Sequence, residues 1–221
     1  MRRERKSFLV VGLGRFGGAL AASLTRAGHE VVGADLDMDI IDALKGDVLE
    51  VLRLDGTNIH ALAEVGVPEF DACVVASGED LGQSLTIVMN LRELGAKRIV
   101  AKAATAQHAV ILEMLGVARR DVVFPERDMG ERMAHVLGSP LIADFVSLAA
   151  DLSLVEVDAP PAMVGSNLID LDLRRRHGVT VVGIRRGSEF IGSPRAEEVI
   201  AAGDRLVLIG AADYIARFLQ R

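Results

Sequence analysis

Short apolar runs alternate with longer amphipathic segments through the first 125 residues. Each run is about four to seven residues long, rich in β-branched residues and apolar at successive positions, which is typical of strands buried on both faces of a parallel sheet. The pattern predicts strands at residues 8–11, 31–35, 48–54, 72–76, 98–103 and 122–124. Six such runs, each followed by a segment of helical length, favour an α/β domain.

The segments between these runs have the period of amphipathic helices. Phe16, Leu20 and Leu24 follow one another at intervals of four residues and would form a single apolar stripe. Helices are predicted at residues 16–27, 58–65, 81–94 and 106–115. Right-handed crossovers would place them on both faces of the sheet, which makes the expected fold a Rossmann-like, doubly wound parallel sheet.

The alternation stops after Pro125. Residues 126–137 predict one helix with an apolar stripe of Met129, Met133 and Leu137, and no strand follows it directly. A small α+β lobe comes next, with predicted strands at 152–157, 180–185, 189–191 and 205–209 and helices at 167–175 and 213–219. The predicted domains are 1–125, a linker helix at 126–140 and a C-terminal lobe at 141–221. A lobe of this size has a marginal core, so we expect it to pair with another copy.

Composition and charge narrow the class of protein. The chain has 221 residues, half of them hydrophobic and a quarter charged, with a net charge of -6, which excludes a disordered or fibrous protein. No uncharged run approaches the ~18 apolar residues of a membrane-spanning helix, and no signal peptide is recognised, so a soluble, cytoplasmic protein is expected. The excess of acidic over basic residues argues against a nucleic-acid partner. The single cysteine, Cys73, lies in an apolar run and is interpreted as a buried hydrophobe.

The strongest local signal for function is a glycine pattern, Gly12, Gly14 and Gly17, between the first strand and the first helix. In this context the first glycine permits a tight turn, the second lets the backbone approach a pyrophosphate, and the third allows close packing. Asp35 ends the second strand, where an acid accepts hydrogen bonds from ribose hydroxyls, and Asp37 could assist it. An acid here disfavours NADP. The alternative is a glycine turn that only packs, with Asp35 as a solvated strand end.

Groups that could catalyse a reaction are few. Tyr214 is the only tyrosine and lies in the last predicted helix, and the five histidines form no recognisable acid/base cluster. A Walker A lysine loop and a nucleophile elbow are both missing from the sequence. The sequence therefore favours a sensor over an enzyme. The main alternative is a small NAD-dependent oxidoreductase, and a third is a redox-sensing transcriptional regulator, which would need a DNA-binding helix pair that the sequence does not show.

The chain resembles, nearly end to end, the cytosolic regulatory subunits of Ktr and Trk potassium-uptake systems, which are built from regulator-of-potassium-conductance (RCK) domains. The resemblance rests on VGLGRFGG at 11–18, LDGT at 54–57, AK at 101–102, FPE at 124–126, DMG at 128–130, GVTVVGIRR at 178–186 and GDRLVLIG at 203–210. The glycine-loop variant together with DMG indicates the Ktr branch, and a single nucleotide domain agrees with it.

This resemblance implies a non-catalytic gating-ring subunit. Dimers would assemble into an octameric ring beneath a membrane-embedded potassium transporter, so that the protein is cytoplasmic and peripheral to the inner face of the membrane. ATP would favour the conducting state and ADP the resting state, with NAD or NADH as alternative occupants of the same site.

The resemblance also implies a set of site residues. Those expected at the nucleotide are Gly12, Gly14, Arg15, Phe16, Gly17, Asp35, Leu36, Asp37, Asp55, Gly56, Ser77, Gly78, Glu79, Lys102, Ala103, Ala104, His108 and Glu126. Arg15 is expected at the terminal phosphates, and Glu126 at a divalent cation, Mg²⁺ or Ca²⁺. Plainer interpretations stay open: Lys102 and His108 as surface groups, and Glu126 as an acid that suits a helix N-terminus.

The C-terminal lobe resembles modules that bind cyclic di-AMP at a two-fold interface. The candidate residues are Ile169, Asp170, Arg174 and Pro194. Their mixture of apolar and basic side chains suits bases and phosphates, and a plain dimer interface would explain the same residues.

Overall fold

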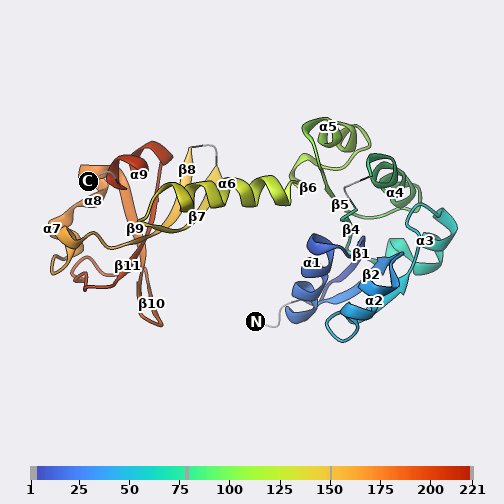
Figure 1. Ribbon diagram of the computed structural model, residues 1–221, viewed down its shortest axis with the longest axis horizontal. Coiled ribbons are helices and arrows are strands. Elements are labelled where there is room, and N and C mark those ends of the chain that lie inside the picture. The colour runs from blue at the N-terminus through green and yellow to red at the C-terminus, as the bar shows by residue number, and fades with distance from the viewer. Residues whose placement is uncertain (1–3, 78–79, 150, 220–221) are drawn as a thin grey trace. The chain divides into compact units, whose positions relative to one another are not determined.

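The chain folds into two compact units. The computed structural model describes residues 4–77, 80–149 and 151–219. The units comprise Met1–Pro125 and Glu126–Arg221, and each has a sheet of its own (Figure 1). Within the described residues, no helix is both long enough and apolar enough to cross a membrane.

The first unit is built on a six-stranded parallel sheet. Its strands are β1 (Ser7–Val11), β2 (Glu30–Asp35), β3 (Glu50–Arg53), β4 (Ala72–Val75), β5 (Ile99–Lys102) and β6 (Val122–Val123). Their order across the sheet is β3-β2-β1-β4-β5-β6, with every neighbouring pair parallel. The order reverses between β1 and β4, so the carboxyl ends of these two strands mark the switch point of a doubly wound sheet. The predicted fold class is confirmed.

Helices cover both faces of this sheet. They are α1 (Arg15–Arg26), α2 (Met38–Leu44), α3 (Ile59–Val65), α4 (Leu81–Glu93) and α5 (Ala106–Met114), with short 3₁₀ turns at Val67–Glu69 and Arg119–Asp121. Leu9 and Val11 of β1 belong to one apolar cluster, with residues of α3, α4 and α5. Val10 belongs to another, with residues of α1 and α2. Successive strand residues therefore enter opposite cores, which explains why the strand is apolar throughout.

Cys73 lies on β4 and is buried. Burial disfavours the thiolate and raises the pKa of Cys73 to about 12. The thiol is therefore protonated at neutral pH, which confirms its interpretation as a small buried hydrophobe.

The sequence did not predict α2. This helix has seven residues and begins after Asp37, whose Oδ1 accepts a hydrogen bond from the N–H of Asp39 at 2.9 Å. Only Ile41 of the helix is buried. A helix of about two turns with one capping residue and one buried apolar residue has too little periodicity to be recognised from the sequence.

The second unit contains α6 (Pro125–Gly138), which agrees with the predicted helix, and a five-stranded antiparallel sheet. The other elements are β7 (Ile142–Ala149), β8 (Leu152–Asp158), a 3₁₀ turn (Pro161–Met163), α7 (Leu168–Leu171), α8 (Leu173–His177), β9 (Val179–Arg186), β10 (Glu189–Gly192), β11 (Arg205–Gly210) and α9 (Ala212–Leu219). The strand order is β10-β9-β11-β8-β7. The expected α+β lobe is confirmed.

Two elements of this unit differ from the prediction. Strand β7 was not expected, because its pairing with β8 shifts register twice and a regular alternation is lost. The helix predicted at 167–175 is two helices, because Asp172 takes a left-handed conformation (φ 42°) between α7 and α8. The N–H of Asp172 donates to the carbonyl oxygens of Leu168 and Ile169 and closes α7.

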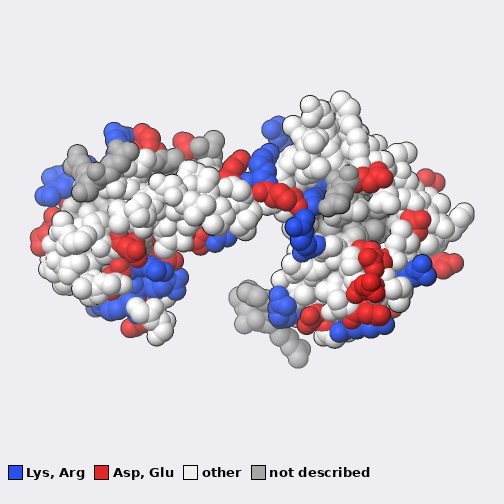
Figure 2. All heavy atoms as spheres, in the orientation of Figure 1, with Lys and Arg blue, Asp and Glu red and all other residues white. Residues whose placement is uncertain are grey.

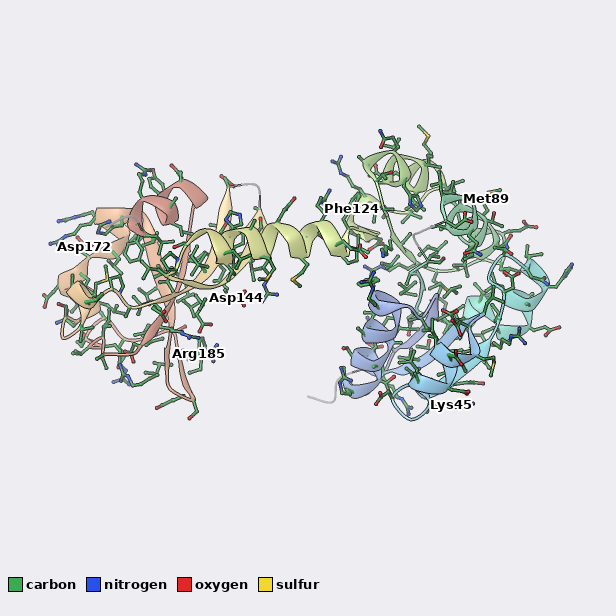
Figure 3. All side chains as sticks on the ribbon, in the orientation of Figure 1. Lys45, Met89, Phe124, Asp144, Asp172 and Arg185 are labelled. Atoms are coloured by element: carbon green, nitrogen blue, oxygen red, sulfur yellow. The ribbon has the colours of Figure 1, made fainter. Side chains whose placement is uncertain are left out.

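Helix α6 is fixed to its own sheet by two side chains. Arg132 donates two hydrogen bonds to Asp144 of β7, at 2.8 and 2.7 Å, and the His135 ring stacks on Phe145 with 3.7 Å between centroids. Asp144 is labelled in Figure 3. None of the residues of α6 is buried, so its methionine stripe stays accessible.

A charged group also stabilises the second unit. Asp204 is 1% exposed, and it accepts hydrogen bonds from Arg186 Nε (2.9 Å), Arg186 Nη2 (2.8 Å) and the N–H of Ala201 (2.8 Å). The hydrogen bonds from Arg186 hold the pKa of the Asp204 carboxyl below its usual value. A carboxyl whose pKa is lowered by folding stabilises the protein above its unfolded pKa, and this stability is lost as the pH falls through the folded pKa.

We therefore expect Asp204→Asn to lower the free energy of unfolding at neutral pH by roughly 2 kcal/mol, because it weakens hydrogen bonds to a charged acceptor. The difference from wild type should begin to shrink below pH ~4, the usual pKa of an aspartate, and should vanish only as the pH falls through the lower pKa of the folded Asp204 carboxyl. Unfolding followed by circular dichroism at several pH values measures this. Asp158→Asn is the control, since Asp158 pairs with Arg205 at the surface and should change little. A constant difference across pH would contradict the expectation.

Candidate nucleotide-binding site

Two of the three loop glycines are required by the fold itself. Gly12, directly after β1, has φ +90°, and a Cβ there would lie 2.7 Å from the backbone nitrogen of Ser77. A Cβ on Gly17 would overlap the carbonyl oxygen of Gly12. The first glycine therefore permits the turn and its approach to the end of β4, and the third permits close packing of α1.

Gly14 has no such internal reason. Its φ is -59°, which other residues adopt, and a Cβ built on it would meet no atom of the described residues within 4 Å. It precedes α1, which has no side-chain cap and no acidic residue in its first turn. Among the residues that the structure describes, no side chain caps the first N–H groups of α1, and these groups lie where an anion gains from the helix dipole. Arg15 is exposed at the first position of this helix.

Asp35 connects the end of β2 to the glycine loop. Its Oδ2 accepts a hydrogen bond from the N–H of Leu13 at 2.6 Å, and its Oδ1 accepts one from the N–H of Asp37 at 3.0 Å. Leu36 is about half exposed beside it. The side chain of Asp37 caps α2, so Asp35 is the better placed of the two acids. Figure 2 shows acidic side chains gathered over β2 and α2, an unfavourable surface for an additional phosphate.

The ends of β3 and β4 complete this edge of the sheet. Asp55 Oδ1 accepts from the N–H and the hydroxyl of Thr57, at 2.9 and 2.7 Å, and so shapes the turn after β3. Gly56 is buried, and a Cβ on it would lie 2.7 Å from a methyl carbon of Val11. Asn90 of α4 donates to the carbonyl oxygens of Gly56 and Thr57. Sequence reasoning missed Asn90, whose only signal was a polar residue among the apolar ones of a helix.

Two side-chain atoms at this edge lack a partner among the described residues. They are Ser77 Oγ, after β4, and His108 Nε2, on α5. The hydroxyl oxygen of Ser84, on α4, is also buried without a hydrogen-bond partner among the described residues. His108 is buried, and burial lowers its pKa. Its Nδ1 accepts from the N–H of Ala104 at 3.3 Å, so the neutral ring carries its proton on Nε2. Such buried polar atoms are suited to a ligand.

The remaining predicted residues are placed differently. Lys102 ends β5 and is half-buried, and the side chain of Ala103 belongs to the apolar core. Phe16 is half-buried on α1. Gly78 and Glu79 lie outside the described residues. Glu126, in the first turn of α6, belongs to the second unit, and the described residues contain no group of three or more metal-ligating side chains.

The candidate residues of the C-terminal lobe divide into two places. The N–H of Ile169 donates to the carbonyl oxygen of Ala196 at 3.0 Å, which brings α7 against the loop that contains Pro194. Asp170 is exposed on the same helix. Arg174 lies elsewhere, in the lining of a cavity of about 350 Å³ that the other three candidate residues do not line. The remaining lining residues are Arg175, Arg176, His177, Gly178, Tyr214 and Arg217.

Family models match both units. The TrkA-N domain matches residues 8–125 and the TrkA-C domain matches residues 152–221. The chain is 38% identical over 217 residues to Ktr system potassium uptake protein C of Bacillus subtilis, covering 98% of this chain and 97% of that protein. The chain belongs to the Ktr family. Two further members, the Ktr system potassium uptake proteins A of Bacillus subtilis and Vibrio alginolyticus, are 31% and 30% identical over 98% and 100% of this chain, and 97% and 99% of their own lengths.

Solved structures show the same fold. The GsuK RCK domain superposes with a TM-score of 0.66 at 19% identity and covers all of this chain and 48% of its own. The GsuK channel bound to NAD gives a TM-score of 0.67 at 19% identity, covering 99% of this chain and 40% of that one. The fold of a Ktr-family subunit is thus that of an RCK domain, as the sequence motifs implied.

Proposed function

We propose that the chain is a non-catalytic regulatory subunit of a potassium uptake system and that it responds to an adenine nucleotide. Membership of the Ktr family, whose curated members are potassium uptake proteins, supports the class of function. The observation that carries the nucleotide is Gly14, a glycine that neither a positive φ nor packing against the described part of the chain requires. Space for a phosphate beside the N-terminus of α1 accounts for it.

ATP or ADP is the proposed ligand, with NAD or NADH as alternatives for the same site. The acid of β2 would accept hydrogen bonds from the ribose hydroxyls. Ser77 Oγ and His108 Nε2 would gain the partners that they lack. A channel of the same fold, GsuK, has been solved with NAD bound.

The proposed mechanism is a shift between two states of an assembly. A ligand changes such an equilibrium only through its different affinities for the two states, and the γ-phosphate is the difference between ATP and ADP. Arg15 would contact the terminal phosphates, in this subunit or in a neighbouring one. Glu126 would bind the terminal phosphates through Mg²⁺ or Ca²⁺, because a carboxylate close to phosphates is repelled unless a hard cation lies between the two groups.

The proposed assembly is a homodimer that builds an octameric ring under a membrane-embedded potassium transporter, which makes the protein cytoplasmic and peripheral to the membrane. Cyclic di-AMP is proposed as a further ligand of the C-terminal lobe, at Ile169, Asp170, Arg174 and Pro194. The exposed side chains of Ile169 and Arg174 support this, since bases pack on apolar groups and phosphates pair with arginine.

Gly14→Ala tests the nucleotide site. The added methyl group meets no atom of the described residues, so the fold should keep its stability, whereas a phosphate approaching the backbone would meet the methyl group. We expect the affinity for ATP and for ADP, measured by calorimetry, to fall by about tenfold or more. Potassium uptake in cells that carry the variant should no longer respond to ATP or ADP through this subunit. Gly138→Ala is the matched control, since a Cβ there also meets nothing within 4 Å in the described ranges of the chain.

Unchanged nucleotide affinity in Gly14→Ala would contradict the proposed site. The oxidoreductase alternative makes a different prediction, namely steady oxidation of NADH in the presence of a small carbonyl substrate. Turnover of that kind, lost in Gly14→Ala, would replace the regulatory proposal with an enzymatic one.

A further inference from the structure

A basic cavity lies at the opposite end of the first unit's sheet from the glycine loop. Its volume is about 480 Å³, and its lining comes from the ends of α4 and α5, the start of β5 and the turn before β6: Arg92, Ala96, Lys97, Arg98, Ile99, Gly116, Ala118, Arg120 and Asp121. Ile99 is the first residue of β5, whereas the glycine loop follows the last residue of β1. Because the strands are parallel, the cavity lies at the amino ends of the strands and the glycine loop lies at their carboxyl ends.

The charge of this cavity is opposite to that of the chain. Arg92, Lys97, Arg98 and Arg120 line it, with Asp121 as the single acid of the lining, while the chain has a net charge of -6. Asp121 is buried, and Arg98 covers it. The exposed part of the lining is therefore strongly cationic, and a concave surface of one charge concentrates anions of the other.

Two of the arginines are held in position by the fold. Arg98 Nε lies 3.1 Å from Asp121 Oδ2, and Arg98 Nη2 lies 2.5 Å from Oδ1, a two-pronged contact that fixes the plane of the guanidinium. Arg92 Nη1 donates to the carbonyl oxygen of Leu115. A Cβ on Gly116 would overlap the Arg92 guanidinium, so this glycine leaves the space that the arginine occupies.

Contacts within the protein explain the positions of Arg92 and Arg98, but they do not explain those of Lys97 and Arg120. Arg92 satisfies a carbonyl at the end of α5, and Arg98 neutralises a buried carboxylate. Lys97 and Arg120 are both exposed beside them, and Lys97 Nζ makes a long contact of 3.4 Å with the carbonyl oxygen of Glu69. Asp121 neutralises Arg98, so Arg92, Lys97 and Arg120 leave the cavity with a net positive charge, and a bound anion would relieve the repulsion between them.

We propose that this cavity is a binding site for a phosphate-bearing anion, separate from the nucleotide site. Two arginines of fixed orientation would donate their remaining N–H groups to the phosphate oxygens, while Lys97 and Arg120 would add charge. The phosphate would come from a small soluble anion or from the headgroup of an anionic lipid. This inference does not depend on the proposed function, because it uses neither the glycine loop nor the nucleotide.

The double variant Lys97→Gln with Arg120→Gln tests the site and spares the contact between Arg98 and Asp121. Calorimetric titration of the full chain with inorganic pyrophosphate, in low-salt buffer, should show binding to the wild type that weakens about tenfold or more in the variant. Arg119→Gln is the matched control: Arg119 is an exposed neighbour that does not line the cavity, and its loss should leave the affinity unchanged. Circular dichroism checks that each variant is folded.

A second arm identifies the source of the phosphate. Co-sedimentation with vesicles of phosphatidylglycerol, against vesicles of phosphatidylcholine, should show the same ranking of variants if the ligand is a lipid headgroup. Binding of pyrophosphate or of phosphatidylglycerol that depends on Lys97 and Arg120 supports the proposal. Binding of neither, equal loss in Arg119→Gln, or pyrophosphate binding that the double variant does not change would overturn it. The last outcome would place pyrophosphate elsewhere, for example at the glycine loop.

Discussion

Replacing Asp35 by alanine is expected to weaken the binding of ATP, ADP and NADH by about ten- to a hundredfold, because charge-assisted hydrogen bonds contribute roughly 1.5 to 3 kcal/mol. The carboxylate lies at the end of β2 and already binds the N–H groups of Leu13 and Asp37. A carboxylate can accept about four hydrogen bonds, and we expect the lone pairs that these two bonds leave to accept from ribose hydroxyls. Calorimetry with each nucleotide measures the effect.

Two further variants separate the charge of Asp35 from its structural contact. Asp35→Asn keeps an oxygen acceptor for the N–H of Leu13 but loses the negative charge and the acceptor for the N–H of Asp37, so it should show an intermediate affinity. Asp42→Ala removes an acid of α2 that pairs with Lys45 at the surface, and it should bind nucleotide like the wild type. Wild-type affinity in Asp35→Ala, with the fold intact, would remove the acid from the proposed site.

Replacing Met129 by aspartate is expected to convert the proposed oligomer into monomers. Met129 is 50% exposed, Met133 42% and Leu137 80%, and their spacing of four residues places them along one side of α6. We expect this stripe to be covered by another copy of the chain, where a carboxylate would be buried without a partner, at a cost of several kcal/mol. Size-exclusion chromatography with light scattering gives the mass directly.

The control for this substitution is Glu131→Asp. It places an aspartate within the same helix, on the side away from the stripe, and therefore reproduces the loss of helix propensity without entering the expected interface. Its mass should equal that of the wild type. A Met129→Asp protein that elutes with the wild-type mass would show that the stripe has a different role.

The parallel sheet could be predicted because its strands are apolar on both faces. Val10 packs against one set of helices while Leu9 and Val11 pack against another, which leaves an uninterrupted apolar run in the sequence. The elements that were missed have weaker patterns. Helix α2 depends on the cap by Asp37, and β7 depends on a partner strand that tolerates two register shifts. The division at Asp172 depends on a left-handed residue, which no hydrophobic period reveals.

The candidate site was predictable to a similar degree. The spacing of Gly12, Gly14 and Gly17 and the position of Asp35 follow from the strand–turn–helix context. The contact between Asn90 and the loop after β3, and the unpartnered Nε2 of His108, arise from tertiary packing. These features depend on which segments meet in space, and local sequence patterns do not contain that information.

The burial of Cys73 has a practical consequence for following nucleotide responses. The chain has one cysteine, and its thiol stays protonated and shielded inside β4. Maleimide dyes react with exposed thiolates, so a cysteine introduced at a chosen surface position would take the label while the native one is spared. Distances between subunits could then be recorded by fluorescence energy transfer without first removing the natural residue.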